Sequence, residues 1–168
     1  RRPSRIDRLQ TGDRAAALKV HAGTYALTNT TKGDLDVTAP MIIEGAGTGA
    51  TIVTAAGLNA AGAPDRVFDA TTAGDLTISD LTLRDGTVFG RGGIIRSDAS
   101  LQLTDVVVLN GRSTLQGGLI YSTDYVYLDG AELVNGRADT DGGGLATGAG
   151  GSVQTGSPST ISNCTRDV

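Results

Sequence analysis

The chain has 168 residues, of which 39% are apolar, 25 are glycine and none is tryptophan, and its formal net charge is −4. This composition is typical of one folded domain with a core of Leu, Ile, Val and Ala, and it excludes a disordered chain and an aromatic core. Residues 1–20 carry six basic and two acidic side chains, whereas residues 21–168 carry eight basic and sixteen acidic ones. Such an acidic, aromatic-poor body argues against nucleic-acid binding.

The first nineteen residues differ from the rest of the chain. We expect residues 1–19 to form a basic leader or capping segment, and residues 20–168 to form one repetitive domain. Asp13 is a candidate N-cap for a short alanine-rich helix that would cover the first turn of the fold. The five arginines within residues 1–14 suit either an interaction arm or a solvated leader. The apolar residues available to such a lid are Ile6, Leu9, Ala16 and Leu18.

The segment LDVTAPMIIEG, residues 35–45, is the first of several related eleven-residue segments. It precedes the next one by 41 residues, so we expect an extra loop at residues 58–66, flanked by strands at residues 50–53 and 66–69. Its positions 1, 3, 6 and 8 hold Leu35, Val37, Pro40 and Ile42.

Three closer copies follow at a fixed period of 25 residues: LTISDLTLRDG from Leu76, LQLTDVVVLNG from Leu101 and VYLDGAELVNG from Val126. Positions 1, 3, 6 and 8 are apolar in all three, which predicts two short strands that each have one buried face, with a corner between them. Each copy closes with an Asp-Gly or Asn-Gly turn, and a glycine pair then precedes a third short strand.

A fixed period through three strands and three corners predicts a coil. Equivalent strands of successive coils would then stack in parallel about 4.8 Å apart, with equivalent side chains forming ladders. We therefore predict an all-β fold, a single-stranded parallel β-helix of five to six rungs with three short strands per rung. The crossover rule for parallel strands predicts right-handed winding.

The last copy, VQTGSPSTISN from Val153, begins 27 residues after Val126 and places Ile161 one position late. We expect this rung to be irregular or incomplete, and either the natural protein continues or this end docks on a partner. Cys164 is the one cysteine and His21 the one histidine, so an intramolecular disulfide and a Cys/His metal site are both excluded. Cys164 remains able to pair between chains if it is exposed.

The stretches HAGTYALTN, GDLDVTAPMIIEGAGTGATIV and RVFDATTAGDLTISDLTLRDG, together with the LQLTDVVVLNG rung, resemble the right-handed β-helix, pectin-lyase-like repeat proteins of bacterial surfaces. The likeness covers residues 20–163 and extends to the group with an N-terminal Cys-Ser-Leu-Arg-Glu-Ala motif and to polymorphic outer-membrane-protein and autotransporter-passenger repeats. The chain lacks that motif itself. The resemblance implies the β-helix fold, export and an extracellular or cell-surface location, and it names no activity.

Acidic residues at the predicted corners are candidates for catalysis, but turn formation accounts for them. Asp and Asn bond neighbouring backbone groups in tight turns, so rows of them are expected without any catalysis. Asp139 and Asp141 resemble a calcium-loop fragment that lacks a third ligand. We therefore expect no catalytic, metal-binding or cofactor-binding residue. The corner rows are Asp80 with Asp105, and Asp85 with Asn110 and Asn135.

We interpret the chain as a non-catalytic structural and interaction module that stacks through its rung edges, as a homo-oligomer or on a larger assembly through the open C-terminal rung. The main alternative is a carbohydrate-active β-helix domain, with a shallow groove of Asp and Arg residues that binds or cleaves a polysaccharide. Lateral contacts would come from ladder residues, and the candidates are Tyr121, Tyr125, Tyr127, Arg112 and Arg137.

Overall fold

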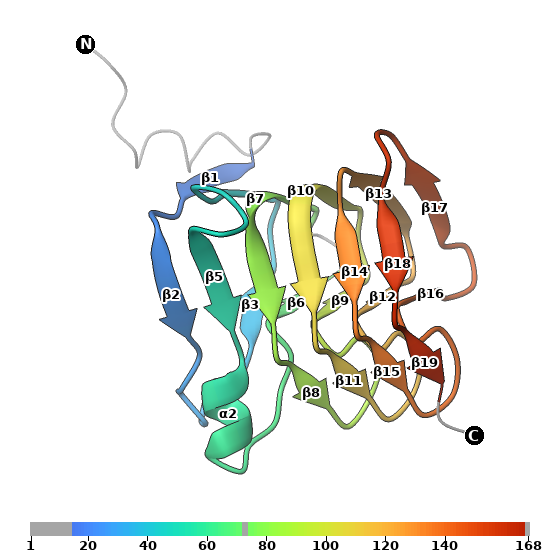
Figure 1. Ribbon diagram of the computed structural model, residues 1–168, viewed down its shortest axis with the longest axis horizontal. Helices are drawn as coiled ribbons and strands as arrows, with labels where there is room; N and C mark the ends of the chain where they lie inside the picture. Colours follow the sequence, from blue (N-terminus) through green and yellow to red (C-terminus); the bar gives the residue numbers. More distant parts are fainter. Residues whose placement is uncertain (1–14, 72–73, 167–168) are drawn as a thin grey trace.

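The computed structural model describes residues 15–71 and 74–166, which form a parallel β-solenoid of about six coils (Figure 1). The predicted fold class is confirmed.

The first two coils comprise β1 (Ala16–Lys19) and β2 (Gly23–Ala26), then β3 (Leu35–Val37), β4 (Met41–Glu44), β5 (Thr51–Thr54) and α2 (Ala56–Ala60). The third and fourth comprise β6 (Phe68–Ala70), β7 (Leu76–Arg84) and β8 (Thr87–Val88), then β9 (Ile95–Ser97), β10 (Leu101–Leu109) and β11 (Arg112–Ser113). The fifth and sixth comprise β12 (Ile120–Ser122), β13 (Tyr125–Asp129), β14 (Glu132–Val134) and β15 (Arg137–Ala138), then β16 (Leu145–Thr147), β17 (Ser152–Thr155), β18 (Thr160–Ser162) and β19 (Thr165–Arg166).

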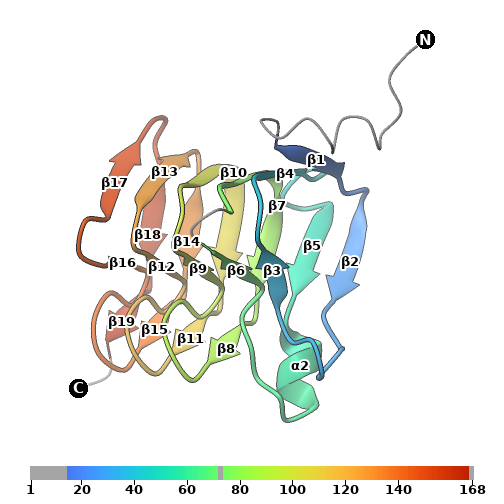
Figure 2. The same ribbon diagram turned by 180° about the vertical axis from the view of Figure 1, so that it is seen from behind.

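The strands form three parallel sheets that enclose one apolar interior. Sheet A follows the order β1-β4-β7-β10-β13-β17, with β2, β5, β14 and β18 attached along it. Sheet B follows the order β16-β12-β9-β6-β3, and its strands are best seen from behind (Figure 2). Sheet C comprises β19, β15, β11 and β8. Successive coils therefore advance along one axis, and the two ends of the stack carry different sequences.

The 25-residue period sets the register of the central coils, as predicted. Leu101 of β10 pairs with Leu76 on one side and with Val126 on the other, and all three side chains are buried. Because equivalent interior positions are aliphatic in each coil, the core is a set of continuous columns of Leu, Ile and Val.

The three corners of each central coil are marked by residues with positive φ. The first corner is occupied by Asp80 and Asp105 at φ 55° and 50°, and the glycine corner by Gly92 and Gly117 at φ 69° and 70°. Asp, Asn and Gly adopt this left-handed region at least cost, which agrees with a corner at these aspartates. The predicted break between two short strands occurs only in the fifth coil, between β13 and β14, whereas β7 and β10 continue through the corner. The second corner holds Asp85, Asn110, Asn135 and Asn163.

The register predicted for the second coil is wrong. Met41, not Leu35, pairs with Leu76, whereas Leu35 pairs with Phe68 in sheet B. Pro40, expected to occupy an interior strand position, directly precedes β4, where its lack of a backbone N–H is harmless. The surplus length lies partly in α2 (Ala56–Ala60), which overlaps only the start of the loop predicted at residues 58–66.

The N-terminal helix expected from Asp13 is wrong where the structure describes it. Ala16–Lys19 form strand β1, which pairs in parallel with β4, so pairing at a sheet edge overrides the helix propensity of this alanine-rich stretch. Leu18 takes the interior side of the strand opposite Ile43. The other members of the expected lid, Ile6, Leu9 and Asp13, lie outside the described residues.

Candidate functional surfaces

Two arginines hold together carboxylates from neighbouring coils on the outer face of sheet B. Arg66 Nη1 lies 3.1 Å from Asp69 Oδ2, and Arg96 Nη1 lies 3.1 Å from the same oxygen. Arg96 also contacts the carboxylate of Asp98 through Nη2. Thr123 Oγ1 in turn lies within hydrogen-bond distance, 3.2 Å, of Asp98 Oδ1. These contacts run from the third coil to the fifth, and Arg66 extends the network to Asp34 in the second coil.

Asp34 is the member of this network with a strongly shifted pKa. Its Oδ2 lies 3.7 Å from Arg66 Nε, and its side chain is 12% exposed. Burial, followed by repulsion from the Asp65 carboxylate, raises the pKa of Asp34 to about 7. Arg66 opposes this shift, but its charge is shared with Asp69. The N-terminal end of sheet B therefore carries more carboxylates than its arginines neutralise.

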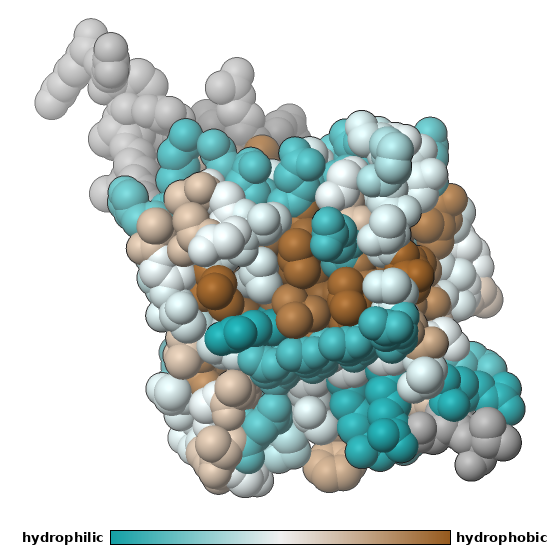
Figure 3. All heavy atoms as spheres, in the orientation of Figure 1, coloured by the Kyte–Doolittle hydropathy of each residue, from teal (hydrophilic) through white to brown (hydrophobic). Residues whose placement is uncertain are grey.

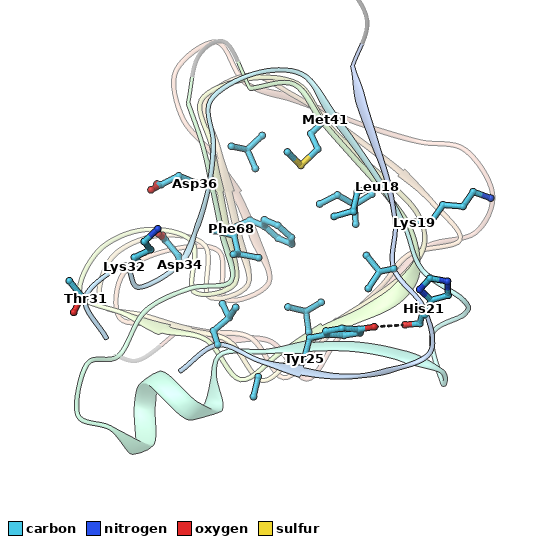
Figure 4. Close-up of a pocket in the computed structure, with 17 residues that line it drawn as sticks. Leu18, Lys19, His21, Tyr25, Thr31, Lys32, Asp34, Asp36, Met41 and Phe68 are labelled. Carbon is cyan, nitrogen blue, oxygen red and sulfur yellow. Dashed lines mark hydrogen bonds between the residues drawn. The ribbon is translucent and has the colours of Figure 1, made fainter. Parts of the chain in front are cut away.

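A hollow of about 1290 Å³ opens beside these residues at the start of the solenoid. Figure 4 shows Leu18, Met41 and Phe68 pointing into this space from three strands, whereas Asp36 points away from it. The ring of Tyr25 closes one side, and its hydroxyl donates to the carbonyl oxygen of His21 at 3.1 Å. The hollow is thus the end of the apolar interior, with charged groups on its outer rim.

The sixth coil presents interior positions to solvent at the other end. Val153 of β17 and Ile161 of β18 are 46% and 55% exposed. They pair with Val126 and Leu133 of the fifth coil, both of which are fully buried. β17 and β18 contain no charged side chain, whereas sheet edges in natural proteins commonly carry charges that block further pairing. The sixth coil therefore combines exposed apolar side chains with uncharged strands.

A second apolar area lies on the outer face of sheet A. Val107 and Leu109 of β10 and Val134 of β14 are half-buried there, and Figure 3 shows apolar surface over these strands, bordered by a hydrophilic row. The row is the second corner of the coils, in which Asn110 Nδ2 donates to Asp85 Oδ1 at 3.1 Å and Asn135 Nδ2 donates to Asn110 Oδ1 at 3.2 Å. These bonds bind consecutive coils together.

The structure does not bring the three predicted tyrosines together. Tyr121 lies in sheet B and is 6% exposed, with the Arg91 guanidinium 5.1 Å from its ring centroid. Tyr125 and Tyr127 lie in β13 of sheet A, where the Tyr125 hydroxyl donates to Gln154 Oε1 at 2.6 Å. Only Tyr125 and Tyr127 are therefore placed to contact a partner through their rings.

The two predicted arginines are neighbours in sheet C. Arg112 pairs with Arg137 in register, and Arg112 Nη2 lies 3.4 Å from Asp139 Oδ1. Asp141, the other acid of the calcium-loop fragment, lies 3.1 Å from Arg166 Nη1. Among residues 15–71 and 74–166, no group of three His, Cys, Asp or Glu side chains is arranged to hold a metal ion.

No family model matches the chain, and neither a search of curated proteins nor a search of solved structures finds a match. Within the described ranges, no helix is long and apolar enough to cross a membrane. The fold therefore defines the class of protein, a parallel β-solenoid.

Proposed function

We propose that this chain is a non-catalytic structural and interaction module of an exported or cell-surface protein, and that it self-associates through its sixth coil. The observation that carries this proposal is the pair of exposed interior side chains Val153 and Ile161 on uncharged edge strands. Their columns are buried in every preceding coil from the third to the fifth. A second chain on this edge would bury them and satisfy the free backbone groups.

The occupant best matched to the sixth coil is a second copy of the same coil. In a symmetric dimer the same coil of each copy lies in the contact, so like charges along it would repel. β17 and β18 bring no charge to such a contact, and Arg166 of β19 is paired with Asp141. The opposite end of the stack is less suited to self-pairing, because Lys19 lies in β1 and Asp36 in β3. Tyr125 and Tyr127, with the apolar area around Leu109, would supply lateral contacts to further partners.

Sedimentation velocity over a hundredfold range of protein concentration tests this proposal. The wild-type chain is expected to show a monomer–dimer equilibrium, and Ile161→Lys is expected to raise its dissociation constant at least about tenfold by placing an unpaired charge in the contact. Phe89→Lys is the matched control, since Phe89 is 82% exposed on the loop after β8, away from the sixth coil. A strictly monomeric wild-type protein, or equal effects of the two substitutions, would rule out the dimer.

A second candidate function is binding or cleavage of an acidic polysaccharide on the outer face of sheet B. It is favoured by one observation, a carboxyl group of Asp34 that titrates near neutral pH beside Arg66. Such a group is suited to donating a proton, and Arg66 and Arg96 are suited to holding sugar carboxylates. Sugar release from a panel of acidic polysaccharides, lost in Asp34→Asn and kept in Asp105→Asn, would support it. Neither release from nor binding to any of these polysaccharides would remove it.

A further inference from the structure

β3 is the end strand of sheet B within the described part of the chain. It pairs with β6 on one side only, through Leu35 opposite Phe68 and Val37 opposite Ala70. Leu35 lies on the interior side of the sheet and is still 40% exposed, because no strand among residues 15–71 and 74–166 covers it at the hollow. The edge therefore leaves both an apolar position and backbone groups accessible.

The backbone of Asp36 faces this free edge. The Leu35 amide donates to the carbonyl of Val67 at 2.9 Å, and the Thr71 amide donates to the carbonyl of Val37 at 3.0 Å. Because neighbouring residues of a strand turn their backbone groups to opposite edges, the N–H and C=O of Asp36 point away from β6. An added strand would bond to these two groups.

The outward side chains of sheet B indicate the charge that a strand added beside β3 should carry. Asp36, Asp69 and Arg96 lie in one row across three coils. Asp69 is bound by two arginines, whereas Asp36 is exposed and has no ion pair within the described residues. Asp34 and Asp65 add negative charge close by. A cation placed next to Asp36 on the following strand would balance this end of the sheet.

Sheet A shows how the molecule covers the same kind of edge. There β1 lies over β4 with Leu18 on the interior side opposite Ile43, and with Lys19 outward. Lys19 Nζ lies 3.3 Å from Glu44 Oε1. The last strand of sheet A at this end therefore places an apolar residue inward and a basic residue beside an outward acid. Sheet B presents the equivalent acceptor, Leu35 inward and Asp36 outward.

We propose that the free edge of β3 binds an extended segment of another protein with the pattern apolar, Lys or Arg, apolar. The segment adds a strand to sheet B, its basic side chain pairs with Asp36, and its apolar side chains cover Leu35 and the mouth of the hollow. This site lies at the opposite end of the solenoid from the proposed dimer contact, so both can be occupied at once.

The probe is a fluorescein-labelled peptide AALKVH, copied from residues 16–21, titrated with the full 168-residue chain while its anisotropy is followed. Saturable binding is expected, with about three- to fivefold weaker affinity for Asp36→Asn and at least about tenfold weaker affinity for Asp36→Lys. Glu132→Lys is the control, because Glu132 is also an exposed acid on an outward strand position, in β14. It is expected to bind the peptide as the wild type does.

A charge exchange separates recognition from loss of fold. The peptide AALEVH should bind Asp36→Lys better than it binds the wild type, which an unfolded variant would not do. The proposal is overturned if the lysine peptide fails to bind the full chain, as it would if other residues of the chain filled this edge. It is also overturned if Asp36→Lys and Glu132→Lys bind the lysine peptide equally.

Discussion

Arg66 Nε lies 3.7 Å from Asp34 Oδ2, and the two side chains are only 10% and 12% exposed. Arg66 therefore stands between two acids, since its Nη1 is bound to Asp69 at 3.1 Å. One cation shared in this way cannot hold Asp34 ionised against burial and the repulsion of Asp65, so its pKa is raised to about 7.

The first prediction concerns pH. Because the pKa of Asp34 is higher in the folded chain than in the unfolded one, the folded state binds the extra proton between about pH 4 and pH 7. The stability that this provides is fully present below pH 4 and is lost as pH rises through 7. Asp34→Asn should therefore be more stable than the wild type at pH 8, by about 1–2 kcal/mol after allowance for solvent screening, and similar to it near pH 5.

Urea unfolding of both proteins from pH 5 to 8 measures this difference. Asp129 does not interfere, because hydrogen bonds from Ser157 lower its pKa and it titrates below this range. Parallel pH profiles for the two proteins would show that Asp34 does not titrate as described.

The second prediction concerns the guanidinium. Arg66→Met keeps much of the side-chain volume and removes the charge, which leaves Asp34 and Asp69 with one arginine fewer. We expect a loss of about 3 kcal/mol in the free energy of unfolding at pH 8, where both acids are ionised. At pH 5 the loss should be smaller, because Asp34 is then protonated. An equal loss at the two pH values would contradict the shared-cation description.

The third prediction concerns the second corner. Asn110 has a φ of 56°, and its side-chain amide donates a hydrogen bond to Asp85 and accepts one from Asn135. Asn110→Ala should cost about 2–3 kcal/mol through backbone strain and two lost hydrogen bonds, whereas Asn110→Gly should cost about 1 kcal/mol, since glycine avoids the strain. Thermal or urea unfolding separates the two. If Ala and Gly cost the same, strain at this corner is negligible.

The fourth prediction concerns the columns of the core. Leu103 is fully buried between Ile78 and Leu128, so Leu103→Ala should destabilise the fold by about 2–5 kcal/mol. Leu115→Ala is the control, because Leu115 is 41% exposed and its truncation should cost below about 1 kcal/mol. Similar losses at the two positions in urea unfolding would argue against a column at Leu103.

The central coils could be predicted from the sequence because period, apolar alternation and turn residues agree there. Leu76, Leu101 and Val126 recur at one spacing, and each copy ends at an Asx-Gly turn. In the second coil two apolar pairs compete, Leu35 with Val37 and Met41 with Ile43. The apolar pattern alone predicts the first pair as the equivalent of Leu76 and Ile78. The pairing of β4 with β7 shows that Met41 and Ile43 take those positions instead.

The candidate surfaces were harder to predict, since they depend on contacts between coils of unequal length. Asp36 and Asp69 are neighbours although 33 residues separate them, so no 25-residue ladder indicates the cluster around Arg66. Tyr121 and Tyr125 are close in sequence, but a turn places them in different sheets. The open sixth coil was easier to recognise, because Ile161 already falls one position out of phase in the sequence.

Hydrogen–deuterium exchange of the wild-type chain in dilute and concentrated solution tests the proposed self-association most directly. If the sixth coil is the contact, the amides of β17 (Ser152–Thr155) and β18 (Thr160–Ser162) exchange more slowly in the concentrated sample, while those of β1 (Ala16–Lys19) are unchanged. Exchange of β17 and β18 at the same rate in both samples would contradict the proposal.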